Sequence, residues 1–530
     1  MESFIRTTVF GQAVRLASRN RLLRYPDELD PSLWKKWTEK TEPAPEQNAE
    51  KQEKHVSSTP PVTKGDDLNC ISAGEEKVLL VGCKWKLLTL SQMFVLNFGI
   101  YIGSSIYVPG EAGLMTDFGV SETVATLGLS MYTVGYGLGP MLWSPLSEIP
   151  VIGRSSIFFW TLVVFVILQL GVGFAPNIAT FLVFRTLTGF FGSPCLATGG
   201  GTIADMYAPA QILFYICIWS SFGVLGPIFG PIIGGYIAPV KGWSWTIWIF
   251  TWLCSAVAIA MFFLLPETSG ANILHNRAKR LRKITGNNRL RSHSEIDAAD
   301  RTLGDHARVL ARAFTLTFSE PIVFLMDLYT GLLYGVLFIW FESFPMVFGE
   351  IYRFDIEKQG LVFLGIFVGS FIAAPLLLLW IQYRIVPVIA SPKFKPEMLL
   401  PPAFAGCIAF PLCLFWYGWS ARQSIHWIMP IIGTGFFGVG IVTLFNSVFN
   451  YLAMSYPFEA ASVFAGNALF RAAFGAGFPL FARTFFRKLG VGAGNSLLGG
   501  IAMCFIPATF VLHRYGGKIR QMSQNARHDV

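Results

Sequence analysis

The chain has 530 residues, of which 53% are apolar and only 14% are charged. Soluble domains are about a quarter charged, so this composition argues against an ordinary soluble enzyme of this length. A bilayer core about 30 Å thick needs roughly 20 apolar residues per helix, and a chain with a mean hydropathy of +0.51 has room for about a dozen such helices. We therefore predict an all-α polytopic membrane protein. We attribute the net charge of +9 to Lys and Arg in cytoplasmic loops rather than to nucleic-acid binding.

The first 86 residues are polar and rich in Glu, Lys, Pro and Ser, a composition typical of disordered segments. No apolar run follows the first Met, so we expect no cleavable signal peptide. A short amphipathic helix is expected at most around Val14 to Leu23. The prediction for 1–86 is a disordered cytoplasmic tail.

Twelve apolar runs follow, and each is long enough for a membrane span: 88–108, 122–143, 155–175, 178–200, 211–237, 243–265, 321–348, 358–382, 397–417, 425–452, 459–482 and 492–513. The stretch 266–320 between runs six and seven carries ten Lys and Arg (277, 279, 280, 282, 283, 289, 291, 301, 308, 312). An even number of spans puts both termini and this stretch on one side, which the positive-inside rule makes cytoplasmic. Arg483, Arg487 and Lys488 would face outward and oppose this assignment.

This layout divides the chain into two halves of six helices each. We expect an N-terminal half at 87–265, a cytoplasmic basic linker at 266–320, a C-terminal half at 321–514 and a cytoplasmic tail at 515–530. Duplicated halves of this kind are typical of secondary transporters, which bind their substrate near the bilayer midplane.

The turn between runs two and three carries an acid, a small residue and a cation within GYGLGPMLWSPLSEIPVIGR, 135–154. An Arg can bind the carboxylate of a neighbouring helix in a fork, and Asp205 at the inner end of run four is a candidate partner for Arg154. The alternative is a solvated turn with one stop-transfer charge. We assign a cytoplasmic gate to Gly139, Ser147, Glu148, Gly153, Arg154 and Asp205.

Three ionisable residues lie inside apolar runs and are candidates for proton coupling: Arg185, Asp327 and Glu342. A buried Arg costs at least ~2.5 kcal/mol on insertion scales, so Arg185 should face the bundle interior or an aqueous cavity. A fixed positive charge there can act on a nearby carboxylate, and Asp327 and Glu342 are the candidates. The structural alternative for each is a bond that holds two helices together.

Run five contains glycines spaced by four, which leave one helix face bare so that another helix can approach closely. Two tandem Gly-Pro pairs add prolines that remove backbone hydrogen bonds and favour a kink. The residues of this motif are Gly223, Gly226, Pro227, Gly230, Pro231, Gly234 and Gly235. Polar and aromatic residues of other runs are candidates for lining a cavity, with a hydrogen bond between helices as the alternative: Asn97, Tyr101, Trp219, Asn450, Asn467 and Arg471.

Together these motifs resemble the twelve-span drug:proton antiporters of the major facilitator superfamily, in particular the fungal multidrug-resistance branch. The turn resembles that superfamily's loop motif, with Glu148 where Asp is usual, and run five resembles the motif of proton-coupled exporters. Similar stretches include YIGSSIYVPG (101–110), SPCLATGGGTIADM (193–206), LPET (265–268) and FESFPMVF (341–348). The usual Asp-Pro-Glu-Asn-Pro-type segment before the first span is replaced here by 74–86.

This resemblance implies a major facilitator fold and proton-coupled efflux of hydrophobic small molecules (drugs, fungicides or an endogenous secondary metabolite or toxin) by alternating access. It also implies a likeness to monomeric plasma-membrane proteins that need no cofactor or metal. A proton-coupled nutrient importer and a non-transporting membrane sensor of the same fold remain as alternatives. We expect no enzyme activity, because no His-rich or H-x(4)-D cluster occurs, and no ATP-driven export, because G-x(4)-G-K-[ST] is missing.

Overall fold

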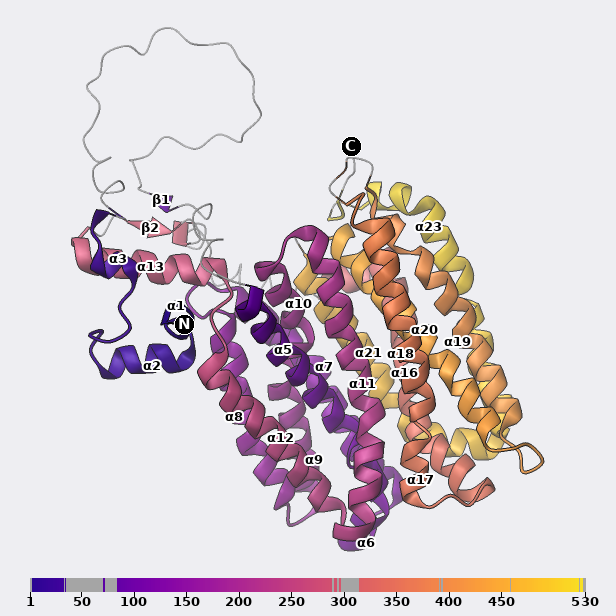
Figure 1. Ribbon diagram of the computed structural model, residues 1–530. Helices are drawn as coiled ribbons and strands as arrows, with labels where there is room; N and C mark the ends of the chain where they lie inside the picture. Colours follow the sequence, from indigo (N-terminus) through magenta and orange to yellow (C-terminus); the bar gives the residue numbers. More distant parts are fainter. Residues whose placement is uncertain are drawn as a thin grey trace.

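The computed structural model describes residues 2–32, 34, 70–71, 83–287, 290–292, 295–296, 314–389, 391, 394–457, 459–523 and 525–527. Most of them lie in long helices that form two bundles side by side, the first drawn from indigo to magenta and the second from orange to yellow (Figure 1). The predicted all-α architecture of two halves is confirmed.

The N-terminal half consists of α5 (Cys83–Ser105), η3 (Val108–Gly110), α6 (Glu111–Phe118), α7 (Glu122–Glu148), α8 (Arg154–Gly173), α9 (Ile178–Gly192), α10 (Pro194–Met206), α11 (Pro209–Lys241) and α12 (Trp243–Leu264). The predicted fourth span is divided between α9 and α10 at Ser193. Proline has no N–H to continue the backbone ladder, and Pro194 follows directly.

The C-terminal half consists of α16 (Pro321–Phe344), η4 (Pro345–Ile351), α17 (Ile356–Leu361), α18 (Leu364–Trp380), η5 (Ile381–Ile385), η6 (Pro396–Leu399), α19 (Pro401–Ser420), α20 (Ile428–Ser455), α21 (Ala460–Leu489), α22 (Val491–Met503) and α23 (Ile506–Gln521). Of the described helices, ten are long and apolar enough to cross a membrane. The other two predicted spans lie in α7 and α21, which pack against each other between the halves. Helices that face protein rather than lipid can contain more small and polar residues.

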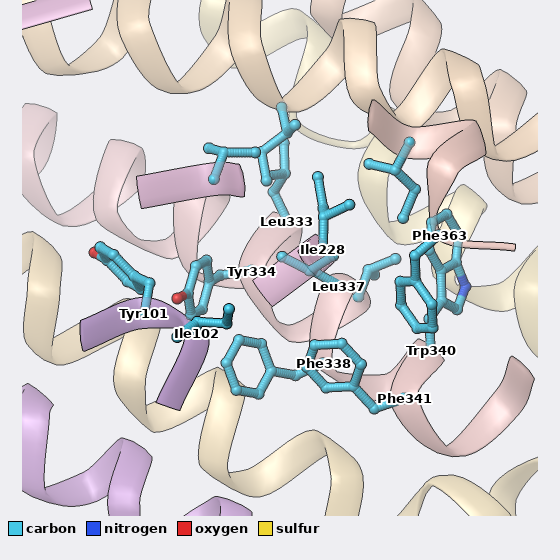
Figure 2. Packing of buried hydrophobic residues seen from close by; sticks show 14 of the residues in the cluster. Tyr101, Ile102, Ile228, Leu333, Tyr334, Leu337, Phe338, Trp340, Phe341 and Phe363 are labelled. Carbon is cyan, nitrogen blue, oxygen red and sulfur yellow. The ribbon is translucent and has the colours of Figure 1, made fainter. Parts of the chain in front are cut away.

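The core continues from one half to the other. Tyr101 and Ile102 of α5 and Ile228 of α11 belong to the same buried cluster as residues of α16 (Figure 2). The rings of Tyr101 and Tyr334 lie 6.3 Å apart, centre to centre. The two halves are therefore in direct contact at mid-height.

The first residues of the chain are ordered, unlike the expected disordered tail: α1 (Glu2–Ile5), α2 (Val9–Ala17) and α3 (Pro26–Leu29) precede the membrane helices. The one expected amphipathic helix lies several residues earlier, in α2. Arg15 Nη2 lies 2.6 Å from Glu28 Oε1. Burial raises the pKa of Glu28, but hydrogen bonds from the Arg15 side chain and the Tyr25 backbone, together with the charges of Arg15 and Arg280, outweigh burial and the net pKa is lowered. Internal ion pairs thus hold this polar segment together.

The same N-terminal segment binds the first helix of the basic linker, α13 (Gly270–Thr285). The Arg280 guanidinium lies 3.6 Å from the centre of the Tyr25 ring and 3.4 Å from Asp27 Oδ2. Strand β1 (Cys70–Ile71) pairs in parallel with β2 (Arg291–Ser292) beyond α13. Figure 1 shows α13 and the end of α23 at the same end of the bundles. We call this end the linker side.

Candidate functional site

A small closed cavity lies between the two halves. Asn97, Tyr101 and Trp219 line it from the N-terminal half, and Tyr334 and Arg471 line it from the C-terminal half. Its volume is about 20 Å³, which is room for about one water molecule. Sites for drug-sized ligands have volumes of about 300–1,000 Å³, so the halves must separate before such a compound can enter.

A polar network crosses the cavity wall. Arg471 Nη1 donates to the Tyr101 hydroxyl at 2.8 Å and Nε donates to Asn467 Oδ1 at 3.0 Å. Asn467 Nδ2 in turn donates to Asp327 Oδ1 at 2.8 Å, and Asp327 Oδ2 has no hydrogen-bond partner. Asn467 therefore lies behind the cavity, between the one cation that lines it and the nearest buried carboxylate of α16. Asn450, also expected at the cavity, is buried but is not among the lining residues.

On the linker side, stacked aromatic rings close the cavity. The Phe449 and Phe464 rings lie 3.9 Å apart and nearly parallel, and Trp219 of the other half lies 6.2 Å from Phe449. Ser220 of α11 donates a hydrogen bond to Asn446 of α20. Contacts between the halves thus seal this end without any ion pair among these residues.

On the opposite side, an ion-pair cluster closes the cavity. Arg483 of α21 pairs with Glu122 of α7, and its Nε lies 2.5 Å from Glu342 Oε2 of α16. The Glu342 side chain is 1% exposed, and Thr126 of α7 lies 3.3 Å from its other oxygen. We call Arg483, Glu122, Glu342 and Thr126 the latch. It joins the two halves, and with the linker-side rings closed as well the protein is occluded.

The predicted pairing at the turn between α7 and α8 is confirmed. Arg154 Nε lies 2.7 Å from Asp205 Oδ2 at the end of α10. A Cβ atom on Gly201 would lie 2.1 Å from Arg154 Nη1, so a larger residue there would displace the guanidinium from its present place against α10. Glu267 accepts hydrogen bonds from the backbone nitrogens of Arg154 and Ser155. It satisfies donors that the first turn of α8 leaves unpaired, and it ties the end of α12 to this pair.

Arg185 is fully buried in α9, but its neighbours differ from the expected carboxylates. Its Nε donates to the carbonyl of Gly128 at 3.1 Å and its Nη1 to that of Gly103 at 2.9 Å. The guanidinium lies 4.8 Å from the Tyr107 ring centre and 4.5 Å from that of Tyr132. Within the described part of the chain no ion pair joins Arg185 to Asp327 or Glu342. Carbonyls and aromatic faces stabilise this charge instead.

The glycine face of α11 packs directly on α5. A Cβ on Gly226 would lie 2.5 Å from Tyr101 Cβ, and a Cβ on Gly234 would lie 2.1 Å from the Ile106 carbonyl. Despite Pro227 and Pro231, α11 continues from Pro209 to Lys241. On the opposite side, Gly360 of the C-terminal half lies against Pro231, where a Cβ would be 2.5 Å from the carbonyl. The motif thus positions α5 and also contacts the other half.

Residues 93–482 match the Major Facilitator Superfamily. The chain belongs to this superfamily. It is therefore a multi-pass membrane transporter, and the predicted fold is confirmed.

Curated relatives are similar over most of their length. Transporter mfs1 of Schizosaccharomyces pombe is 39% identical, with 83% of this chain and 85% of the relative covered. The cycloheximide resistance protein of Candida maltosa is 34% identical over 99% and 100%. Fluconazole resistance protein 1 of Saccharomyces cerevisiae is 39% identical over 83% and 81%. The solved structure of the proton:xylose symporter XylE has the same fold, with a TM-score of 0.61 at 12% identity over 82% of this chain and 96% of that one.

The sequence analysis does not assign several residues of the site, among them Glu122, Thr126, Arg483 and Glu267. From sequence, Arg483 is expected only as an outward-facing charge that opposes the positive-inside rule; in the structure it pairs with acids on two other helices, as ionisable residues of the membrane region commonly do. Glu267 belongs to the stretch LPET (265–268), for which the sequence predicts no contact. Its place just after an apolar run gave no sign that it binds the start of α8.

Proposed function

We propose that this transporter exports hydrophobic small molecules, with protons moving in the opposite direction. Relatives named for resistance to cycloheximide and fluconazole support efflux. The observation that carries the proposal is the closed cavity between halves, with aromatic walls and a buried carboxylate network beside it. In this proposal the linker side faces the cytoplasm and the protein functions as a monomer in the plasma membrane.

The two carboxylates of α16 are the proposed proton carriers. Asp327 and Glu342 are separated by 15 residues of one helix, which is roughly 22 Å along its axis. Glu342 belongs to the latch on the outer side, and Asp327 lies beside Arg471 toward the cytoplasm. A proton from outside would neutralise Glu342, and so weaken both its hydrogen bond from Thr126 of the N-terminal half and its pairing with Arg483, the residue that crosses to Glu122. The outer side would then open and release the compound.

Return to the inward-facing state requires that the proton leaves toward the cytoplasm. Asp327 has one oxygen held by Asn467 and one without a partner, so it can hold a proton without breaking that bond. Arg154 and Asp205 join α8 to α10 at the cytoplasmic end, and we assign them the inner gate that the sequence predicted for this turn. Arg185 fixes α5, α7 and α9 to one another and keeps the N-terminal half rigid as it moves.

Transport by purified protein in sealed vesicles tests the proposal. The vesicles carry an imposed pH gradient and contain no ATP. Protein in the inside-out orientation should pump a fluorescent hydrophobic compound into the vesicle, and this uptake is measured. We expect uptake that stops when a protonophore collapses the gradient. Uptake that continues unchanged after the pH gradient collapses would refute antiport. If correctly folded protein takes up no compound at all, a sensor would be favoured.

A further inference from the structure

The cavity wall carries a positive charge that no acid on the wall balances. Arg471 is the one charged residue among the described residues that line the cavity, and the remaining lining residues are apolar, aromatic or neutral polar. Asp327 lies behind Asn467 rather than on the wall. A compound in the cavity therefore meets the cation before it meets the carboxylate.

The Arg471 guanidinium is placed so that it can bind a ligand. Its Nε and Nη1 have partners, whereas Nη2 has no hydrogen-bond partner among the described residues. The charge lies 5.3 Å from the Tyr334 ring centre and 4.9 Å from that of Phe445, which hold the side chain from two sides. A held guanidinium with a free N–H favours a carboxylate or a carbonyl oxygen.

A second donor without a partner belongs to Trp219, a residue of the cavity wall, where its indole edge packs against Gly199 of α10. Trp219 is 3% exposed and its indole Nε1 has no hydrogen-bond partner. A buried N–H without a partner is unfavourable, by an amount comparable to a lost hydrogen bond. Indole can only donate, so this group also favours an acceptor on the ligand. The walls between the two donors are the rings of Tyr101, Phe445 and Phe449, which suit a flat apolar ligand.

From these contacts we infer that the exported compounds are aromatic or polycyclic molecules that carry an acceptor (a ketone, an amide or a weak carboxylic acid), and that permanently cationic compounds are rejected. The acceptor binds at Arg471 Nη2, while the ring system lies on the aromatic wall; Trp219 Nε1, which packs against Gly199 in the closed cavity, becomes the second donor once the halves separate. A cation would face Arg471 with no carboxylate on the wall to pair with. This inference deepens the proposed efflux function and rests on it for the direction of transport.

Binding of three matched probes to the full-length protein in lipid nanodiscs tests the inference. The probes share one ring system and differ in charge: 2-naphthoate, 2-acetylnaphthalene and (2-naphthylmethyl)trimethylammonium. We expect the acid and the ketone to bind at least tenfold more tightly than the ammonium compound. A cation that binds as tightly as the acid would overturn the inference, and so would the failure of all three probes to bind.

Two variants locate the recognition. Arg471→Gln should weaken binding of the acid more than binding of the ketone, because only the acid loses a partner of opposite charge. Trp219→Phe keeps a ring but loses the donor, and should weaken both acceptor probes by about three- to tenfold, the value of one hydrogen bond. Unchanged affinities in both variants would contradict the assignment. If the probes bind in the expected order but the vesicles show no gradient-driven flux, the proposed antiport is rejected and this inference stands. If gradient-driven flux occurs but prefers the cation, this inference is rejected and the antiport stands.

Discussion

Replacing Arg483 by Gln should open the side of the protein opposite the linker side, which the proposed function places outside. Arg483 joins α21 to Glu122 of α7 and to Glu342 of α16, so it is the residue through which the latch connects the two halves by charge. Gln keeps most of the length of the side chain but loses the charge and the fork. The occluded state should lose stability relative to the outward-open state.

The magnitude follows from burial. Glu342 is 1% exposed, and leaving a buried charge without its partner costs about 3 kcal/mol or more. Glu122 is 33% exposed, so its pair with Arg483 contributes only about 0.5 kcal/mol. Because Glu342 faces Thr126 of the N-terminal half, separation of the halves lets water reach its carboxylate, so we expect the unpaired charge to penalise the closed state alone; about 3 kcal/mol then changes the ratio of closed to open protein by roughly 100-fold. The double variant Arg483→Gln with Glu342→Gln leaves no buried charge unpaired and should recover much of the closed state.

Distances between spin labels on the outer side measure this change. Thr116 of α6 and Glu357 of α17 are exposed and belong to different halves, so labelled cysteines at these sites report their separation. Arg487→Gln is the matched control, because Arg487 is exposed on the same helix one turn further on. We expect Arg483→Gln to shift the distribution to longer distances and the control to leave it unchanged. An unchanged distribution in Arg483→Gln would refute the latch.

Three further predictions concern the other charged groups. Arg154→Glu should lower the initial rate of efflux about fivefold, because a partly exposed ion pair contributes about 1 kcal/mol. Adding Asp205→Arg should restore part of the rate, and no recovery would argue against this pair as a gate. Arg185→Ala should abolish efflux with normal surface expression while Arg185→Lys retains a fraction, and normal transport by the Ala variant would reduce Arg185 to a packing residue. Glu28→Gln should increase hydrogen exchange in residues 2–32 severalfold at pH 7. Because the pKa of Glu28 is lowered in the folded protein, the ionised carboxylate stabilises this segment above the ordinary carboxyl range, and this stabilisation is lost as the pH falls through the lowered pKa. The variant and the native protein should therefore exchange at the same rate in acid.

Much of the fold could be predicted because the membrane imposes a simple rule on the sequence. Each span needs a long apolar run, and the runs at 155–175 and 243–265 correspond closely to α8 and α12. The N-terminal tail could not be predicted in the same way. Its helices are short, and part of what holds them comes from α13: Arg280 lies against the Tyr25 ring and pairs with Asp27, about 250 residues earlier in the chain.

The site was predictable where residues had a local reason to be unusual. Arg154 and Asp205 were paired because both lie at the same end of neighbouring spans. The cavity contacts of Tyr334 depend instead on how two halves meet, and its 3.2 Å hydrogen bond with Tyr136 joins residues nearly 200 positions apart. No periodicity in one helix contains that information. For the same reason the sequence does not predict the neighbours of Arg185. The depth of a residue in the bilayer can be estimated from its position in an apolar run, but the direction in which its side chain points around the helix axis cannot.

The break at Ser193 gives the fourth span two parts with different electrical surroundings. α9 carries Arg185, whose charge is held by carbonyls of α5 and α7, while α10 carries Asp205 at its far end. A continuous helix would transmit any rotation of the inner end directly to the buried Arg. Ser193 keeps helical backbone angles, but Pro194 cannot donate a hydrogen bond across the break, so we expect α10 to tilt with Arg154 while the Arg185 contacts stay intact. The inner end of this span can then move at low energetic cost, while the part deeper in the bilayer, where moving a charge would be most expensive, stays in place.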